Sequence, residues 1–306
     1  MTDSTKTAEQ DALWRFQYRE LRYLKFATAD EIQERHDDII RNAYFVARDG
    51  RLYSKGNYTR WMQLLAHILE EAALRKIELV REKIAPYRSA LRAAELWDAL
   101  DLQRGTYLLK FGKSEFMTPL YEKGLLQVSP ASTYLDDKFN RAIRDDERKF
   151  VQESLGATVQ FPPGRGYSIP REQWLSVPVV GTLKQITAYE SECYMACFSM
   201  RYEYRLFDEF GYDACLVIRT PLRFLDMIKA RSATVLPEWQ FSAGRVFYRD
   251  PFYPSPSQDV LFSKHFRFAY EQEFRLVWEP PSKQESIKPI LLELGALSGD
   301  CDLLVL

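Results

Sequence analysis

The chain has 306 residues, of which 46% are hydrophobic, 28% are charged and 14% are aromatic. This composition is typical of globular proteins and excludes disordered, collagen-like and low-complexity classes. The 42 Lys and Arg residues nearly balance the 43 Asp and Glu residues, for a formal net charge of -1, so charge alone gives no attraction to nucleic acids or anionic membranes.

The distribution of proline and glycine divides the chain into two parts. The first 100 residues hold only one of the 15 prolines, Pro86, and two of the 13 glycines, Gly50 and Gly56. Helices exclude both residue types, whereas turns between strands need them. Because a single core stops growing beyond about 250 residues, we predict an α+β protein with a helical domain at 1–104 and an α+β domain at 105–306.

The cysteines and the N-terminus are those of a cytoplasmic protein. Four cysteines in 306 residues are too few for a disulfide scaffold, and no apolar signal segment follows Met1. No run approaches the roughly 18 consecutive apolar residues of a membrane span. We therefore expect a cytoplasmic location, free thiols and no membrane partner.

Apolar residues recur at steps of three and four residues over 61–84, which is the pattern of one buried helix face. Two shorter helices are expected before it, at about 9–27 and 29–47. Pro86 ends or kinks the long helix, and a further helical pattern follows at 91–100.

Behind residue 105 the pattern changes to short apolar runs between turn residues, which predicts strands. The predicted strands are 107–111, 125–129, 177–188, 194–199, 214–219 and 268–278. Helical patterns interrupt them at 137–155 and 220–231.

Charged residues crowd the predicted helix at 137–155. Its basic members alternate with Asp145, Asp146 and Glu147, so we expect a solvated helix face rather than a nucleic-acid site. The basic residues of this face are Arg141, Arg144, Arg148 and Lys149.

Several familiar catalytic motifs are absent from the sequence. It contains no GxxxxGK[ST], GxGxxG or GxSxG motif, which disfavours phosphate-loop enzymes and α/β-hydrolases. Cys193 and Cys197 lie four residues apart, but no second pair and no nearby histidine completes a zinc site. We therefore expect no metal centre.

One strand pattern combines charge with alternation. Over 268–278, the side chains of Glu271, Glu273 and Arg275 are expected on one face of a strand, with aromatic and aliphatic residues on the other. Two carboxylates and a guanidinium in a row either form a solvated ladder or face a cleft.

A resemblance covers about two thirds of the chain. From about residue 106 onward the sequence resembles a broad bacterial family described as a domain of unknown function. The segments that carry the resemblance are Leu109-Lys110-Phe111, Gly124 to Pro130, Thr133 to Asp137, Cys197-Phe198-Ser199, Tyr212 to Ile218, Val246-Phe247-Tyr248, and Lys264 followed by Tyr270-Glu271-Gln272-Glu273-Phe274-Arg275.

A looser resemblance is to the ADP-ribosyltransferase superfamily, which implies a split β-sheet that binds NAD. That fold holds NAD between an early strand with Arg or His, a middle strand with Ser or Tyr, and a late strand with Glu. The matching residues here are Lys110 or Phe111, then Ser129, Ser132 and Tyr134, and finally Glu271-Gln272-Glu273. Lys110 gives a point charge where Arg would offer a bidentate fork.

This resemblance implies a transferase that uses NAD as a substrate. Cleavage of the nicotinamide bond develops positive charge on the ribose, and Glu273 would stabilise that charge through the 2'-hydroxyl. Glu271 would orient or deprotonate the acceptor. The expected acceptor is a nucleic acid or a protein, as for a toxin or phage-defence effector with an antitoxin or regulatory partner.

The cofactor-binding residues follow from the same comparison. Tyr134 would stack on the nicotinamide, Ser129 or Ser132 would hold the ribose, and Lys110 would meet the pyrophosphate. Arg275 is expected to contribute to the same site.

Two other functions compete with the transferase. A non-catalytic interaction module would use an aromatic surface that includes Tyr248, Phe252 and Tyr253. A metal-dependent nuclease would use a third set of residues, namely Asp213, Glu271 and Glu273.

Overall fold

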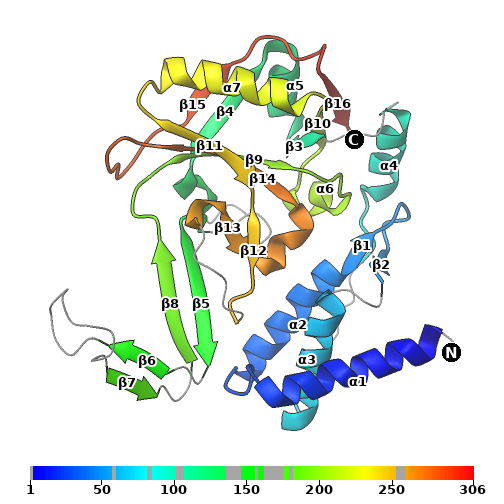
Figure 1. Ribbon diagram of the computed structural model, residues 1–306. Coiled ribbons are helices and arrows are strands. Elements are labelled where there is room, and N and C mark those ends of the chain that lie inside the picture. Colours follow the sequence, from blue (N-terminus) through cyan, green and yellow to red (C-terminus); the bar gives the residue numbers. More distant parts are fainter. Residues whose placement is uncertain are drawn as a thin grey trace.

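The computed structural model describes residues 3–56, 60–80, 85–100, 102, 107–135, 146–155, 158–161, 175–178, 182–252 and 259–306. It confirms the α+β class, with helices concentrated in the first third and strands in the remainder (Figure 1). The predicted domain boundary near residue 104 lies outside the described residues. The α-helices are α1 (Asp3–Leu21), α2 (Ala29–Ala43), α3 (Arg60–Arg75), α4 (Ala90–Ala99), α5 (Ser114–Lys123), α6 (Arg205–Phe210) and α7 (Pro221–Val235).

Local signals set the limits of the N-terminal helices. Thr28 caps α2 through a reciprocal capping box with Glu31. Helix α3 ends at Arg75, earlier than the 61–84 pattern predicted, because Lys76 adopts a left-handed φ of 57°. The N–H of Ile77 then donates to the carbonyl of Ala72 at 2.9 Å, which closes the helix as a Schellman motif.

The main sheet consists of antiparallel strands in the order β11-β14-β9-β3-β10-β16, and β4 joins it by pairing with β9 and with β15. Most of the predicted strands are confirmed. The bounds of these strands are β3 (Leu108–Gly112), β4 (Leu125–Pro130), β9 (Tyr194–Ser199), β10 (Ala214–Ile218), β11 (Gln240–Arg245), β14 (Glu273–Glu279), β15 (Ile290–Glu293) and β16 (Cys301–Val305).

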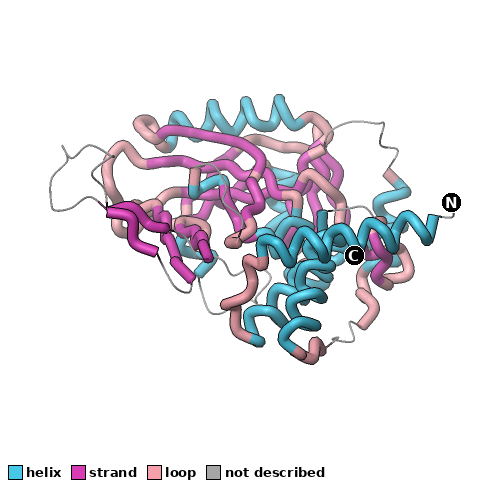
Figure 2. Tube along the Cα trace, turned by 60° about the horizontal axis from the view of Figure 1, so that its bottom comes forward, coloured by secondary structure: helices cyan, strands magenta, loops and turns pink. Residues whose placement is uncertain are grey.

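Helices cover both faces of this sheet, as Figure 2 shows. Strand β10 is therefore buried along its whole length. Leu216 and Ile218 pack on one side with Phe224 and Ile228 of α7, whereas Val217 packs on the other side among residues of α4 and α6. The alternation of side chains along a strand divides the core into these two layers.

The sheet forks along one edge of β9. Strand β3 pairs with β9 at a single register position, Leu109 opposite Ser199. Strand β4 pairs with the other end of the same edge, where Ser129 lies opposite Met195. Between the two contacts the carbonyl of Cys197 accepts a hydrogen bond from the Lys110 Nζ at 3.0 Å. The sheet is thus open at its centre, and a side chain bridges the opening.

A long antiparallel arm extends from the body of the protein (Figure 1). It contains a β5–β8 pair and a β6–β7 pair. Its strands are β5 (Lys149–Leu155), β6 (Thr158–Phe161), β7 (Leu175–Pro178) and β8 (Thr182–Ala188). The helix predicted over 137–155 is wrong for 149–155, and its first part, 137–145, lies outside the described residues. The strand predicted at 177–188 is divided between β7 and β8.

The remaining short elements connect the helical part to the sheet. They are β1 (Tyr44–Val46), β2 (Leu52–Ser54), β12 (Phe247–Arg249), β13 (Ser263–His265) and the 3-10 helices η1 (Ala131–Leu135), η3 (Val260–Phe262) and η4 (Phe266–Glu271). Asn42 of α2 donates to the carbonyls of Phe266 and Arg267, and Phe266 packs in the core of α1, α2 and α3. The N-terminal helices therefore support η4 directly.

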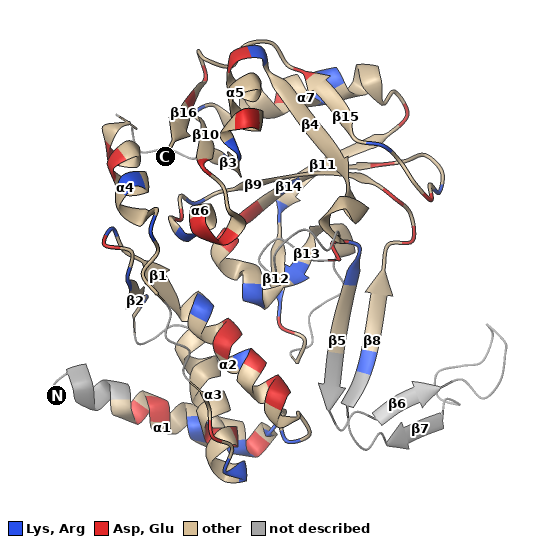
Figure 3. Cartoon of the chain, turned by 180° about the vertical axis from the view of Figure 1, so that it is seen from behind, with Lys and Arg blue, Asp and Glu red and all other residues tan. Residues whose placement is uncertain are grey.

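Charged residues of both signs lie interspersed on the helices and strands (Figure 3). This mixture agrees with the net charge of -1. Among the helices that the structure describes, none combines the length and the apolar character that crossing a membrane requires.

A buried ion pair fastens α2 to the segment after β12. Arg35 donates to both carboxylate oxygens of Asp250, at 2.8 and 2.6 Å, and the two side chains are only 4% and 7% exposed. The guanidinium of Arg35 also lies over the rings of Phe252 and Phe266. This pair joins the helical part to the elements that lead to η4.

We expect Asp250→Ala to lower the free energy of unfolding by about 3 kcal/mol, because the substitution leaves the Arg35 charge buried and unpaired. Urea denaturation followed by circular dichroism measures the change. Asp226→Ala on the exposed face of α7 is the matched control and should change stability by no more than about 0.5 kcal/mol. Equal effects of the two substitutions would contradict this account of the ion pair.

Candidate active site

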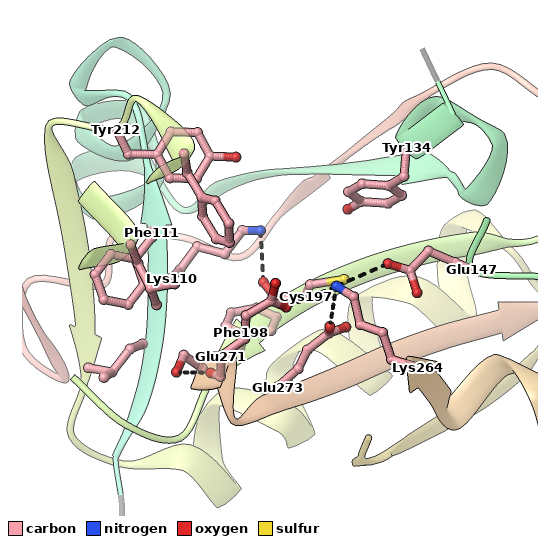
Figure 4. A pocket seen from close by; sticks show the side chains of 14 residues that line it. Lys110, Phe111, Tyr134, Glu147, Cys197, Phe198, Tyr212, Lys264, Glu271 and Glu273 are labelled. Carbon is pink, nitrogen blue, oxygen red and sulfur yellow. Dashed lines mark hydrogen bonds and ion pairs between the residues drawn. The ribbon is translucent and has the colours of Figure 1, made fainter. Parts of the chain in front are cut away.

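A cavity of about 100 Å³ lies at the fork of the sheet. Its polar lining comes from β3, η1, β9, β13, η4 and β14 and from the segments before β5 and β10, and the labelled side chains in Figure 4 converge on one space. The polar lining residues are Lys110, Tyr134, Glu147, Cys197, Ser199, Tyr212, Lys264, Glu271 and Glu273. The apolar lining residues are Leu109, Phe111, Phe198, Leu206 and Phe210.

Two different elements carry Glu271 and Glu273 to this cavity. The strand predicted over 268–278 is wrong for its first part, because residues up to Glu271 form η4 and Gln272 adopts a left-handed φ of 49°. The turn at Gln272 ends η4 and starts β14 at Glu273. The two carboxylates still face one cavity, but a turn between two elements brings them together and strand alternation does not.

Strand alternation does operate from Glu273 onward. Leu276 and Trp278 pack in the core beneath α7, whereas Glu273 and Arg275 point to the opposite side of the sheet. The N–H of Glu273 donates to the Tyr248 hydroxyl oxygen at 2.7 Å, which fixes the start of the strand. Glu273 therefore has a defined backbone position at the cavity wall.

Two cations hold three carboxylates at the cavity. Lys264 Nζ lies 2.9 Å from Glu271, 3.2 Å from Glu273 and 3.4 Å from Glu147. Arg275 donates to Glu273 at 2.7 Å and also contacts Glu147. All five side chains are at most 8% exposed. Such a group is stable only because each charge has an opposite charge in contact.

The two catalytic candidates have opposite pKa shifts. Burial would raise the pKa of Glu273, but Arg275 and Lys264 outweigh burial and hold that pKa below its usual range. Burial raises the pKa of Glu271 to about 8, against the opposing effect of Lys264, and the neighbouring Glu273 adds to the rise. Glu271 contacts Lys264 but not Arg275, which explains the difference.

The balance of charges also indicates that Glu271 is the protonated carboxyl group. If all five groups were ionised, three carboxylates and two cations would leave one net negative charge buried. A single proton makes the group neutral, and Glu271 is the carboxylate with the fewest cationic contacts. At neutral pH the site therefore contains a protonated Glu271 beside an ionised Glu273, the arrangement by which enzymes separate acid and base roles.

Lys110 enters the cavity from β3 and has a different environment from Lys264. Its Nζ donates to the carbonyl of Cys197 and lies 5.3 Å from the centre of the Phe198 ring. Burial lowers the pKa of Lys110, although Cys197 and Glu273 oppose the change. Lys110 is consequently a weaker permanent charge than an exposed lysine would be.

Some predicted site residues lie in the cavity wall and others do not. Lys110, Tyr134, Glu271 and Glu273 line the cavity together. The structure does not bring Ser129 or Ser132 there: Ser129 is in β4 opposite Met195, and the N–H of Ser132 donates to Glu192. Arg275 lies behind Glu273 and donates to carboxylates and to the Leu261 carbonyl. It positions carboxylates and does not line the cavity.

Sequence reasoning missed two members of the ionic group. Glu147 was expected on a solvated helix face, but it is 3% exposed and contacts Lys264 and Arg275. It lies 128 residues before Arg275, so no local pattern connects the two. Lys264 belongs to the segments that carry the family resemblance. Its short distance in sequence from Glu271 and Glu273 could have indicated that it lies in the same site.

Of the residues proposed for the competing functions, Glu271 and Glu273 line the cavity, whereas Asp213, Tyr248 and Phe252 do not. Asp213 accepts hydrogen bonds from the backbone N–H and the hydroxyl of Ser114 at the start of α5, so it does not join the acidic pair. Among the described residues, no group of three or more His, Cys, Asp and Glu side chains is arranged to hold a metal ion. Tyr248 and Phe252 pack against the core of the N-terminal helices, and Tyr253 lies outside the described residues.

Comparison with known proteins gives no relative from which a role could be transferred. No protein-family model, curated protein or solved structure matches the chain.

We expect Lys264→Met to destabilise the protein more at high pH than at low pH. Without Lys264, Glu271 loses its cationic contact, so its pKa rises above the value of about 8 that it has in the wild type. The folded variant then keeps the Glu271 proton to higher pH than the folded wild type does, so its stability falls further as the pH rises from about 7 to 9. The loss should reach about 3 kcal/mol at the upper end.

Urea denaturation of both proteins at the two pH values measures this effect. Lys229→Met, on an exposed position of α7, is the matched control and should be close to wild type at both. A loss that is the same at both pH values would show that Lys264 contributes packing only.

Proposed function

We propose that this protein cleaves the bond between nicotinamide and ribose in NAD and transfers the ADP-ribosyl group to a nucleophile. The observation that carries the proposal is the pair Glu271 and Glu273, which face one cavity with pKa values shifted in opposite directions. Glycosidic bond chemistry typically uses two such carboxylates with separate roles.

Glu273 is suited to stabilise the transition state. Nicotinamide leaves as a neutral molecule, and positive charge develops on the ribose ring. Lys264 and Arg275 keep Glu273 ionised and fixed, and with the Cys197 thiol as a third donor one of its four lone pairs stays available for a ribose hydroxyl. A preoriented carboxylate in a buried site stabilises the developing charge more strongly than water does.

Glu271 is suited to act as the general base on the acceptor. A carboxylate with a pKa near 8 is a stronger base than an ordinary glutamate, and a base is most effective when its pKa is close to the working pH. Its Oε1 has no hydrogen-bond partner among the described residues, which leaves this atom available to an incoming hydroxyl or amine.

The size of the cavity limits which part of NAD enters. Sites that enclose a whole ligand of drug size have volumes of about 300 to 1,000 Å³. With about 100 Å³, this cavity can enclose only part of the nicotinamide ribose end, and the rest of NAD would lie outside it. Tyr134 and Phe111 provide aromatic surfaces for the nicotinamide. We assign Lys110 no pyrophosphate contact, because its burial disfavours a permanent charge there.

Two further features support the assignment. The open sheet between β3 and β4 agrees with the split sheet that the superfamily resemblance implies. The order of the cavity residues along the chain, Lys110, Tyr134 and then Glu273, agrees with its early, middle and late strands. The acceptor, a protein or a nucleic acid, and the role of a toxin or phage-defence effector belong to the same proposal.

We expect Glu273→Gln to reduce nicotinamide release from NAD by about 10²- to 10³-fold, because the amide removes the charge that opposes the developing cation. Chromatography of the reaction mixture measures the product. Glu238→Gln, on an exposed position after α7, is the control and should retain full activity. Undiminished release by Glu273→Gln would remove this residue from the mechanism, and no release by the wild-type protein would remove the proposed function.

We also expect the rate of ADP-ribosyl transfer to increase as the pH rises toward about 8 and to level off above it. Glu271 accepts a proton only when it is ionised, so the rate follows its deprotonated fraction. A pH series with labelled NAD measures the profile. Glu271→Gln should be slower and should lack this rise, and the same slope in both proteins would assign the titration to another group.

A further inference from the structure

The cavity contains two lysines whose surroundings differ. Lys264 contacts three carboxylates and is held as a cation. No carboxylate of the described residues lies within ion-pair distance of Lys110, whose Nζ has the carbonyl of Cys197 at 3.0 Å as its hydrogen-bond acceptor. An ammonium group has three N–H donors to satisfy, whereas a neutral amine has two and a lone pair. Besides this acceptor, Lys110 has only the Phe198 ring, 5.3 Å from Nζ, among its contacts within the described residues, so an ammonium group would leave an N–H donor unsatisfied.

Cys197 and Glu273 oppose the neutral state of Lys110, but burial outweighs both. The titratable side chains that share the cavity with it are Tyr134, Glu147, Cys197, Tyr212, Lys264, Glu271 and Glu273. Burial raises the pKa of Tyr134, Cys197 and Tyr212, so these three stay uncharged at neutral pH. Glu147 and Glu273 are already paired with Lys264 and Arg275. A lysine that is desolvated in a buried pocket is one environment in which enzymes create nucleophilic amines.

An acid lies across the same cavity. Glu271 Oε1 is buried without a hydrogen-bond partner among the described residues, and burial gives this carboxyl group a pKa near 8. It therefore carries a proton at neutral pH. A neutral amine and a protonated carboxyl group that share one small cavity are the two groups that imine formation requires.

We propose that Lys110 forms an imine with a small aldehyde of two to four carbon atoms. The Nζ lone pair attacks the carbonyl carbon, the carbonyl π electrons move to oxygen, and a proton passes from Nζ to that oxygen to give a carbinolamine. Glu271 then protonates the hydroxyl group, the C–O bond breaks, and water leaves as the nitrogen lone pair forms the C=N bond.

The charge balance of this step fits the site. The product is a protonated imine on Lys110 and an ionised Glu271, so the new positive charge forms together with a new negative charge in the same cavity. The cavity volume of about 100 Å³ sets the limit on the aldehyde. The reaction uses no NAD, so its success or failure is independent of the function proposed above.

Reductive trapping tests the proposal on the full chain. The protein is incubated with glycolaldehyde and cyanoborohydride at about pH 7, and the modified lysines are identified by peptide mass spectrometry. An exposed lysine with a pKa of about 10.4 is almost entirely protonated at this pH. We expect Lys110 to be modified at least about tenfold faster than the exposed Lys123 and Lys229.

Two variants complete the test. Glu271→Gln keeps the shape of the protonated carboxyl group but cannot supply the proton, so it should slow the modification of Lys110 at least about tenfold while Lys229 reacts as before. Lys110→Met should lose the fast adduct and keep the circular dichroism of the wild type. Modification of Lys110 at or below the rate of the exposed lysines overturns the proposal, and an unchanged rate in Glu271→Gln removes Glu271 from the step.

Discussion

The contact of two buried cations with three buried carboxylates is the constraint on which the site depends. Lys264 comes from β13, Arg275 and Glu273 from β14, Glu271 from η4 and Glu147 from the segment before β5. Removing Lys264 or Arg275 leaves carboxylate charge buried without compensation, which is among the most costly changes a protein interior can undergo. These elements must therefore fold together, and the carboxylates that the proposed chemistry needs are fixed at the same time.

The fork of the sheet is the second condition for the cavity. A continuous pairing of β3 with β9 would satisfy the Cys197 carbonyl by the backbone ladder and leave no space at this point. Instead, β3 and β4 pair with opposite ends of one edge of β9. Lys110 satisfies the freed carbonyl. Departures from regular strand pairing are expected at functional sites, where the structure is not optimised for stability alone.

The N-terminal helices support this arrangement from outside. Asn42 donates hydrogen bonds to carbonyls of η4, and Arg35 forms an ion pair with Asp250 in the segment after β12. Arg205 donates to the carbonyls of Arg41 and Tyr44 and lies over the ring of Tyr270, next to Glu271. The helical part is thus tied to the element that carries the proposed base, and its packing contributes to the position of Glu271.

The sequence by itself determined the α+β class and most of the strands of the main sheet, and it indicated Glu271, Glu273 and Lys110 as candidate site residues. Alternation, turn residues and short spacings are local properties, so the sequence contains them directly. It did not reveal the left-handed turns at Lys76 and Gln272, the second of which separates the two glutamates into different elements. Only the tertiary structure brought Glu147 to Arg275 and left Ser129 and Ser132 outside the cavity. Contacts between residues far apart in the chain depend on how strands pair, and no local pattern of residues encodes them.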